Sequence, residues 1–382
     1  MGISIIDCHI NALSSGLTVA DLVMPWFMFA MGVSFTYSMS SMFRRGFTKR
    51  DIYTKICIRS VKLLILGLWV VHSNLSWDTF RVPGVLQRFF ICFLVVGGIH
   101  TFFQPVVRIP DHDDRFIDIL PYWPQWIVIL SLEMLWIFLT YFLRYKLPSD
   151  NSQCPQGYIG PGGLHENSKY WNCTGGAAGY IDNKVFGEKH IFQHVTSREV
   201  YFHDEYYFGG YIRHHDPCGI LGSINSIVVV FLGLQAGKIL QCYPDNESRA
   251  VRMALWGGGL TLLGGALTGI QQYDGAMPIN KNLWTLSFAL VTSGWAFFLL
   301  LFLYYVVDVW MVWKGAPFYF VGMNSILIYL LHEILAGQIP FCGDACAGLD
   351  SHAKNMASQI GAVTIWSCYS CFLYINHFFV TL

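Results

Sequence analysis

Long apolar runs recur along this chain and alternate with shorter polar stretches. Most of the runs have about 20 residues, enough for an α-helix to cross the hydrocarbon core of a bilayer. The pattern predicts nine spans, at residues 17–38, 61–72, 85–103, 123–143, 220–240, 253–270, 283–306, 318–337 and 358–380. It therefore indicates an all-α polytopic membrane protein with about nine transmembrane helices and one long loop outside the bilayer.

Composition supports this class. Hydrophobic residues make up 54% of the 382 residues and charged residues only 13%, against roughly 25% charged in ordinary soluble domains. The net charge is zero, so nothing in the sequence suggests a nucleic-acid partner. The lipid bilayer is the partner that the composition implies, and a homo-oligomer is compatible with it.

Basic residues fix the expected orientation. The loop between the first two spans is strongly basic, and such loops face the cytosol. Alternation then places the N-terminus and the long loop in a lumen and the C-terminus in the cytosol. The chain divides into an atypical N-terminal stretch (1–15), transmembrane helices 1–4 (16–143), a luminal loop (144–219) and transmembrane helices 5–9 (220–382).

The predicted luminal regions carry the marks of the secretory pathway. Sequons at Asn172 and Asn74 map outside, so both are glycosylation candidates, whereas the sequon at Asn246 maps inside. Several cysteines also map to the lumen, where disulfides persist, and their pairing is left open: Cys8, Cys154, Cys173, Cys218, Cys342 and Cys346. The run from His214 to Cys218 contains residue types that can bind zinc, but it is interpreted as a polar turn, so no zinc site is predicted.

The stretch Gly16–Gly32 combines an apolar character with Asp21 and Pro25. A carboxylate at membrane depth costs roughly 2.5–3.5 kcal/mol on insertion scales, so it usually faces a bundle interior or a wet cavity. Pro25 removes a helical hydrogen bond close to it. Either Asp21 caps or pairs inside the bundle, or it belongs to a site that handles a polar substrate.

Further polar residues lie in or beside the spans. Arg81, Gln87 and Arg88 occur at the edge of a span, where arginine either binds an anion or snorkels to the interface. The others would fit a polar cavity between helices, or each makes one interhelical hydrogen bond worth roughly 0.6 kcal/mol. They are Asn225, Asn282, Asn324, His332 and Glu333.

Nine motifs of the chain resemble the heparan-alpha-glucosaminide N-acetyltransferase family, in the same order. They are GLTVADLVMPWFMFAMG, SWDTFRVPGVLQR, WPQW, CPQGYIGPGG, NCTGGAAGYID, GILGSINSIV, LGLQAGKIL, NKNLW and GMNSILIYLLHE. The likeness runs from Gly16 onward. Family members carry a luminal domain and two more spans ahead of this point, so the chain is expected to match the family from its third span.

The resemblance implies transfer of acetyl from cytosolic acetyl-CoA to the amine of terminal glucosamine of heparan sulfate, at the lysosomal membrane and without a metal. The amine must be neutral to attack a thioester, so a general base is needed. Whether an acetyl-His intermediate forms or transfer is direct stays open. The residues expected to attract CoA on the cytosolic side are Arg44, Arg45, Lys49, Arg50 and Lys238, although positive-inside topology also explains most of them.

The chain departs from the family at the base itself. The family's essential His lies five residues before the glycine of GLTVADL, where this chain has Asn11, and His9 stands two residues earlier. Either His9 replaces the base or the base is missing, and we expect weak or no activity. His190, His194 and His203 match histidines of the family's loop and are interpreted as loop structure before glycan contacts. The competing class is a polytopic transporter, for which the intramembrane acids Asp21, Glu133 and Glu333 would be suitable.

Overall fold

The computed structural model describes residues 17–70, 80–104, 116–145, 154–160, 162, 169–171, 173–193, 215–269, 276–335 and 352–380. These residues form helices, turns and irregular segments and contain no strand, which confirms the all-α prediction. Contacts divide the chain into two compact units, with the division between Leu301 and Phe302. Each unit is described by itself.

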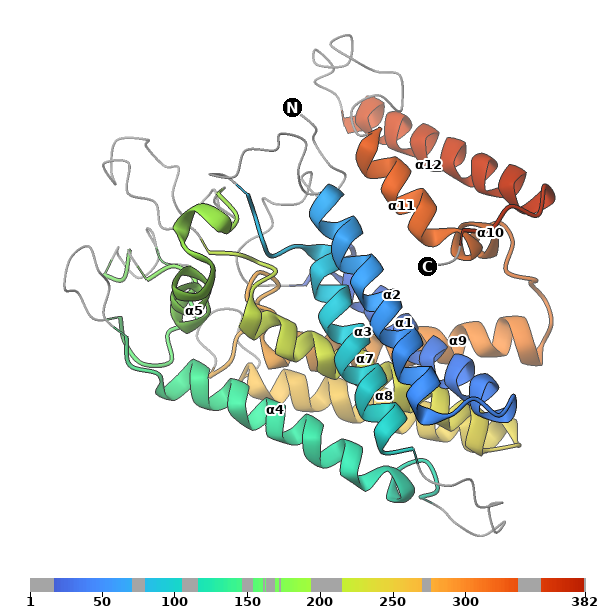
Figure 1. The fold of residues 1–382 in the computed structure, drawn as a ribbon, viewed down its shortest axis with the longest axis horizontal. Coiled ribbons are helices and arrows are strands. Elements are labelled where there is room, and N and C mark those ends of the chain that lie inside the picture. Colours follow the sequence, from blue (N-terminus) through green and yellow to red (C-terminus); the bar gives the residue numbers. More distant parts are fainter. Residues whose placement is uncertain are drawn as a thin grey trace. The chain divides into compact units, whose positions relative to one another are not determined.

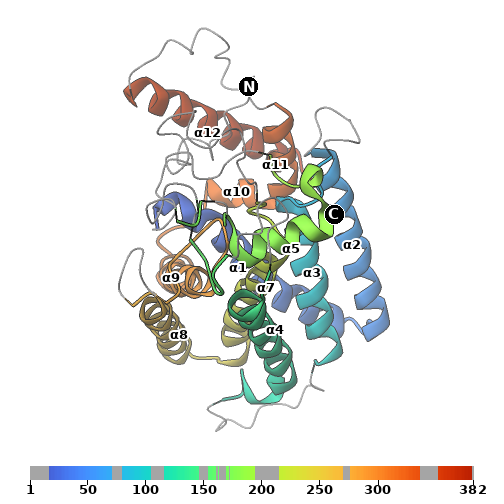
Figure 2. The same cartoon turned by 90° about the vertical axis from the view of Figure 1, so that its left-hand side faces the viewer.

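The first unit is a bundle of long helices (Figures 1 and 2). Its long helices are α1 (Val19–Arg44), α2 (Lys49–Val70), α3 (Val85–Phe102), α4 (Trp123–Phe142), α7 (Ile220–Cys242), α8 (Asn246–Leu267) and α9 (Leu286–Tyr304). A shorter helix, α5 (Gly176–Phe186), lies between α4 and α7 in the sequence. All but α2 and α5 are long and apolar enough to cross a membrane, which makes six candidate spans among the described residues.

The prediction of nine spans is thus confirmed for six and not for the other three. The second predicted span belongs to α2, whose first half is rich in lysine and arginine. The eighth is broken at Asn324 into α10 (Phe318–Met323) and α11 (Ser325–Ile334). The ninth falls in α12 (His352–Ile375), and the part of it whose side chains are described, Gln359–Ile375, is apolar.

Helix α7 is the centre of the first unit. Almost all of its side chains are buried, and it packs against α1, α3, α4, α5 and α8. Glycines let α1 approach it closely, because a Cβ at Gly233 would collide with the carbonyl oxygen of Phe29, and one at Gly32 with that of Val230. Small residues at such contacts are typical of packed transmembrane helices.

Contacts along α7 fix the direction of its neighbours. Gly32 of α1 lies beside Val230, and Thr36 one turn later beside Leu234, so α1 runs parallel to α7. Helix α4 is antiparallel, because Gln125 at its start contacts Lys238 near the end of α7. The bundle therefore has two ends, which we call the Gly219 end, where α7 begins, and the Lys238 end, where α7 finishes.

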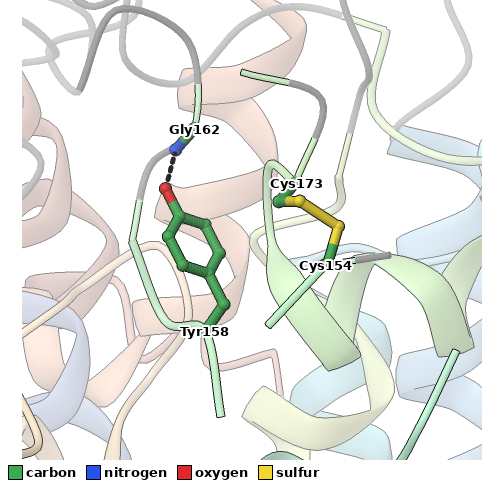
Figure 3. The surroundings of a disulfide bond; sticks show 4 residues. All are labelled: Cys154, Tyr158, Gly162 and Cys173. Atoms are coloured by element: carbon green, nitrogen blue, oxygen red, sulfur yellow. Dashed lines mark hydrogen bonds between the residues drawn. A yellow bond between two sulfur atoms is a disulfide. The ribbon is translucent and has the colours of Figure 1, made fainter. Parts of the chain in front are cut away.

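Part of the predicted loop 144–219 is folded against the Gly219 end. A disulfide joins Cys154 to Cys173 (Figure 3), which supplies one of the pairings that the sequence left open, whereas Cys8, Cys342 and Cys346 lie outside the described residues. Beside it the Tyr158 hydroxyl accepts a 2.8 Å hydrogen bond from the backbone N of Gly162. The disulfide belongs to an apolar core that also includes Trp136 of α4 and Leu221 of α7, so this segment is anchored to the bundle.

The second unit contains the end of α9 and the helices α10, α11 and α12. Asn324, at the break between α10 and α11, is buried and bonded to the C-terminal segment. Its Nδ2 donates to the carbonyl of Phe378 at 3.0 Å, and its Oδ1 accepts from the backbone N of Val380 at 3.0 Å. These contacts give the predicted site residue Asn324 a structural role.

Candidate functional site

A partly buried ion pair between Arg81 and Asp216 lies at the Gly219 end. Arg81, just before α3, donates from Nε and Nη2 to the two carboxylate oxygens of Asp216, at 2.9 and 2.7 Å. Backbone N–H groups of Phe192 and Cys218 donate to the same carboxylate at 3.0 and 2.8 Å. Burial alone would lower the pKa of Arg81, but Asp216 more than offsets this and raises it. Asp216 ties three separate segments together before α7 begins.

Arg88 on α3 is buried beside this pair and is only partly bonded. Its Nη2 donates to the carbonyl of Pro217 at 2.6 Å, and its guanidinium stacks 4.7 Å from the ring of Trp284. Among the described residues, its Nε and Nη1 have no hydrogen-bond partner, and neither does the side-chain amide of Gln87, which lies against Gly67 of α2. Asn225 of α7 donates to the carbonyl of Trp284, and its own Oδ1 has no partner in the described part of the chain. The structure thus brings two predicted site residues, Arg88 and Asn225, together at Trp284.

Asp182 of α5 is a buried carboxylate at the same end that the sequence analysis did not single out. Its Oδ1 accepts a 2.9 Å hydrogen bond from the backbone N of Ile220, the first residue of α7, while Oδ2 has no partner among the residues that the structure describes. Burial raises its pKa to about 7, with a further contribution from Asp216 that the Ile220 N–H and Arg88 oppose. The signal that could have found it is its place in the motif NCTGGAAGYID.

Asp21 lies in the first turn of α1 and has two partners. One oxygen accepts from the backbone N and hydroxyl of Thr18, at 2.9 and 2.8 Å, and the other accepts from Lys281 at 2.7 Å. These are the contacts of a capped helix start with an ion pair, which is the first of the two interpretations of this residue. The helix continues through Pro25.

Lys238 has a different setting from the one expected. It is fully buried, donates to Gln125 at 2.9 Å and lies 3.7 Å from the ring of Tyr122. Gln125 in turn is 3.3 Å from Nδ1 of His100 on α3. Because α3 and α4 cover its side chain, Lys238 lies inside the bundle and not on the surface. Its role toward CoA stays a prediction.

A second polar network adjoins Lys238 at the same end. Asp118 accepts from Gln235 at 2.7 Å and from the Tyr243 hydroxyl at 2.8 Å, and Arg252 lies 3.9 Å away. The four predicted basic residues Arg44, Arg45, Lys49 and Arg50 are exposed between α1 and α2. Lys49 also donates to the carbonyl of Phe102 at 3.0 Å, where α3 ends. The Lys238 end is therefore basic at its surface and polar inside.

The remaining predicted residues fall in three groups. Asn282 is half-buried in the turn after Lys281, and His190 lies 2.7 Å from the carbonyl of Phe80, beside Arg81. His332 and Glu333 lie on α11 in the second unit. The others lie outside the described residues: His9, Asn11, Asn74, Asn172, His194 and His203.

Comparison with known proteins agrees with the motifs. The chain is 44% identical over 375 residues to mouse heparan-alpha-glucosaminide N-acetyltransferase and 43% identical over 381 residues to the human protein of the same name. These matches cover 96% and 97% of this chain and 55% of each relative, so the chain spans about half the length of the curated relatives it matches. No protein-family model matches the chain. The resemblance inferred from the motifs is confirmed.

Proposed function

We propose that this chain forms the membrane part of an N-acetyltransferase. In this proposal acetyl-CoA donates acetyl from the cytosolic side, and the acceptor is the amine of terminal glucosamine of heparan sulfate in the lysosomal lumen. The observation that carries the proposal is the likeness to two proteins named heparan-alpha-glucosaminide N-acetyltransferase, which extends over almost the whole chain.

The geometry of the first unit supports a two-sided reaction. Buried polar groups gather at both ends of the bundle, and α7 contributes to each group, with Asn225 near one end and Lys238 near the other. At 1.5 Å per residue these two positions are about 20 Å apart along the helix. Transfer across a bilayer requires the donor and the acceptor to enter from opposite ends and the thioester carbon of acetyl-CoA to meet the amine between them, with the CoA thiol as the leaving group.

The orientation is assigned from the chemistry of the two ends. The Cys154–Cys173 disulfide belongs to the Gly219 end, and disulfides persist in oxidising compartments such as the secretory lumen. The exposed basic residues Arg44 to Arg50 mark the other end, and positive loops face the cytosol. In the proposal CoA approaches the Lys238 end, where the same residues attract its phosphates, and the sugar approaches the Gly219 end.

Acetyl transfer from acetyl-CoA to a methyl glucosaminide by membranes carrying the chain tests the proposal. Product formation that depends on both substrates supports it, and because Asn11 stands where the family has its base, the rate of this chain is expected to be low. Asn11→His together with the family's preceding span should raise it. Lack of transfer by that well-folded protein would reject the proposal, and uptake of the sugar without acetylation would favour the transporter class. Asp245→Asn serves as a control for the loss of one carboxylate. Asp245 lies at the Lys238 end, where it caps α8 by accepting a 2.8 Å hydrogen bond from the backbone N of Ser248.

A further inference from the structure

Two glycines at the start of α7 each make room for an ionisable side chain: Gly219, its N-cap residue, and Gly222 in its first turn. A Cβ at Gly219 would collide with the carboxylate of Asp182, and one at Gly222 would lie 2.8 Å from Nη2 of Arg88. The carboxylate from α5 and the guanidinium from α3 therefore both approach the start of α7, close enough for Arg88 to act electrostatically on Asp182.

Both groups are buried and incompletely bonded. Asp182 and Arg88 are each 1% exposed. Oδ2 of Asp182 and the Nε and Nη1 atoms of Arg88 have no hydrogen-bond partner among the described residues. A buried charged group without a partner costs free energy, so such atoms are rare in folded proteins unless a ligand or ordered water satisfies them.

The neighbouring ion pair shows that charged groups at the Gly219 end do not generally lack hydrogen-bond partners. Asp216 and Arg81 meet through two direct hydrogen bonds, and two backbone N–H groups complete the carboxylate. Asp182 and Arg88 lie next to that pair, yet they do not bond to each other. The carboxylate of Asp216 therefore has partners on both oxygens, whereas Oδ2 of Asp182 is left to bind a ligand.

We propose that Asp182 and Arg88 bind the acceptor sugar, with Asp182 accepting hydrogen bonds from its ammonium group and Arg88 donating to one of its oxygens. This inference rests on the proposed function and adds the residues that select an amino sugar. The ligand class follows from the chemistry: a free carboxylate oxygen suits a cationic donor, and free guanidinium N–H groups suit a neutral or anionic acceptor.

Proton linkage follows from the setting of Asp182. Burial raises its pKa to about 7, so its carboxyl group is largely protonated in the empty protein at pH 5 to 6. The charged groups that act on it are Arg88 on α3 and Asp216 before α7, and the Cys218 thiol lies near. An ammonium group binds the ionised carboxylate, so binding drives the proton from Asp182 into solvent.

Binding of methyl glucosaminide to the purified chain, measured by calorimetry between pH 5 and 6, tests the inference. Amines of this kind stay protonated below about pH 6, so the carboxyl group is what titrates. We expect release of one proton per sugar bound and about tenfold weaker binding per pH unit as the pH falls. The N-acetylated sugar has no ammonium group and should bind without proton release.

Two variants separate the two residues. Asp182→Asn keeps the oxygen that accepts from Ile220 and should lose binding of the amine alone, whereas Arg88→Gln should weaken binding of both sugars. Asp245→Asn should bind both as the parent does. Amine binding by Asp182→Asn at the affinity of the parent would overturn the inference. So would amine binding to the parent protein without proton release, and this measurement decides if the variant does not fold.

The inference and the proposed function fail in different ways. If the parent transfers acetyl but amine binding ignores Asp182, only the subsite is wrong. If the parent binds the amine with proton release but the chain with Asn11→His and the family's preceding span transfers no acetyl group, the subsite stands as an amino-sugar site and the acetyltransferase proposal is wrong.

Discussion

The Asp182 carboxylate accepts a 2.9 Å hydrogen bond from the backbone N of Ile220, so a side chain from α5 satisfies the first turn of the central helix α7. This contact places a charged group over Gly219 with no space between them. The segment between α4 and α7 is therefore connected to the helix that organises the bundle.

Gly219→Ala should damage the Gly219 end. A Cβ at this position collides with the Asp182 carboxylate, so the carboxylate must move and the cap on Ile220 is lost. Loss of a helix cap typically costs about 1 kcal/mol, and displacement of a buried carboxylate adds to it. Thermal unfolding in detergent should show a lower midpoint.

Gly258→Ala in α8 is the matched control for this change. Nothing lies within 4 Å of a Cβ at Gly258, and alanine favours a helix by about 1 kcal/mol over glycine. Its midpoint should stay the same or rise. Equal losses of stability in the two variants would contradict the close contact at Gly219.

The sequence predicted much of the fold and less of the site. Hydrophobic runs located α1, α3, α4, α7, α8 and α9, because burial in an apolar medium leaves a mark on every residue of a helix. The broken helix at Asn324 was missed, since the break is stabilised by bonds to Phe378 and Val380, more than 50 residues away in the sequence.

The partners of charged residues lie beyond what local pattern can reveal. Asp21 meets Lys281 across 260 residues, and Lys238 meets Gln125 across 113. The sequence shows which residues are charged, but it does not show which distant side chains they bond to. Asp182 was missed for the related reason that its segment was interpreted as a loop, although the paired glycines of GILG, Gly219 and Gly222, hinted at close neighbours.

Stability should depend on pH through Asp182. Its pKa is raised from the ordinary 3.8 to about 7 in the folded protein, so the folded state holds a proton that the unfolded state has lost between these values. The contribution of this group to stability is fully present below about pH 4 and disappears as the pH rises toward 7. Asp182→Asn should therefore flatten the unfolding profile between pH 4 and 7, measured as the thermal midpoint. A parental slope in the variant would assign the pH dependence to other groups.

Lys238 should affect the donor more than the acceptor. Lys238→Met keeps most of the aliphatic side chain inside the bundle and removes the ammonium group that bonds Gln125. A hydrogen bond from this ammonium group to the bound donor would be worth about 1.5–3 kcal/mol, so KM for acetyl-CoA should rise at least about tenfold if the donor reaches Lys238. KM for the sugar should stay near the parental value. A change confined to the sugar would reverse the assignment of the two ends.

Glycosylation reports the orientation. Asn172 precedes Cys173 of the disulfide, whereas Asn246 begins α8 at the Lys238 end. In a secretory-pathway host, Asn172→Gln should remove a glycosidase-sensitive mobility shift and Asn246→Gln should leave it unchanged. A shift that disappears only with Asn246→Gln would mean that the bundle has the opposite orientation.

Sided acetyl transfer tests the central claim most directly. The chain with Asn11→His and the family's preceding span is purified and placed in vesicles with its Lys238 end outward, labelled acetyl-CoA is added outside, and methyl glucosaminide is enclosed within. The proposal predicts labelled N-acetylglucosaminide inside the vesicles, with the label absent when vesicles lack the chain. Vesicles that hold folded protein and both substrates on these opposite sides, yet form no product, would contradict it.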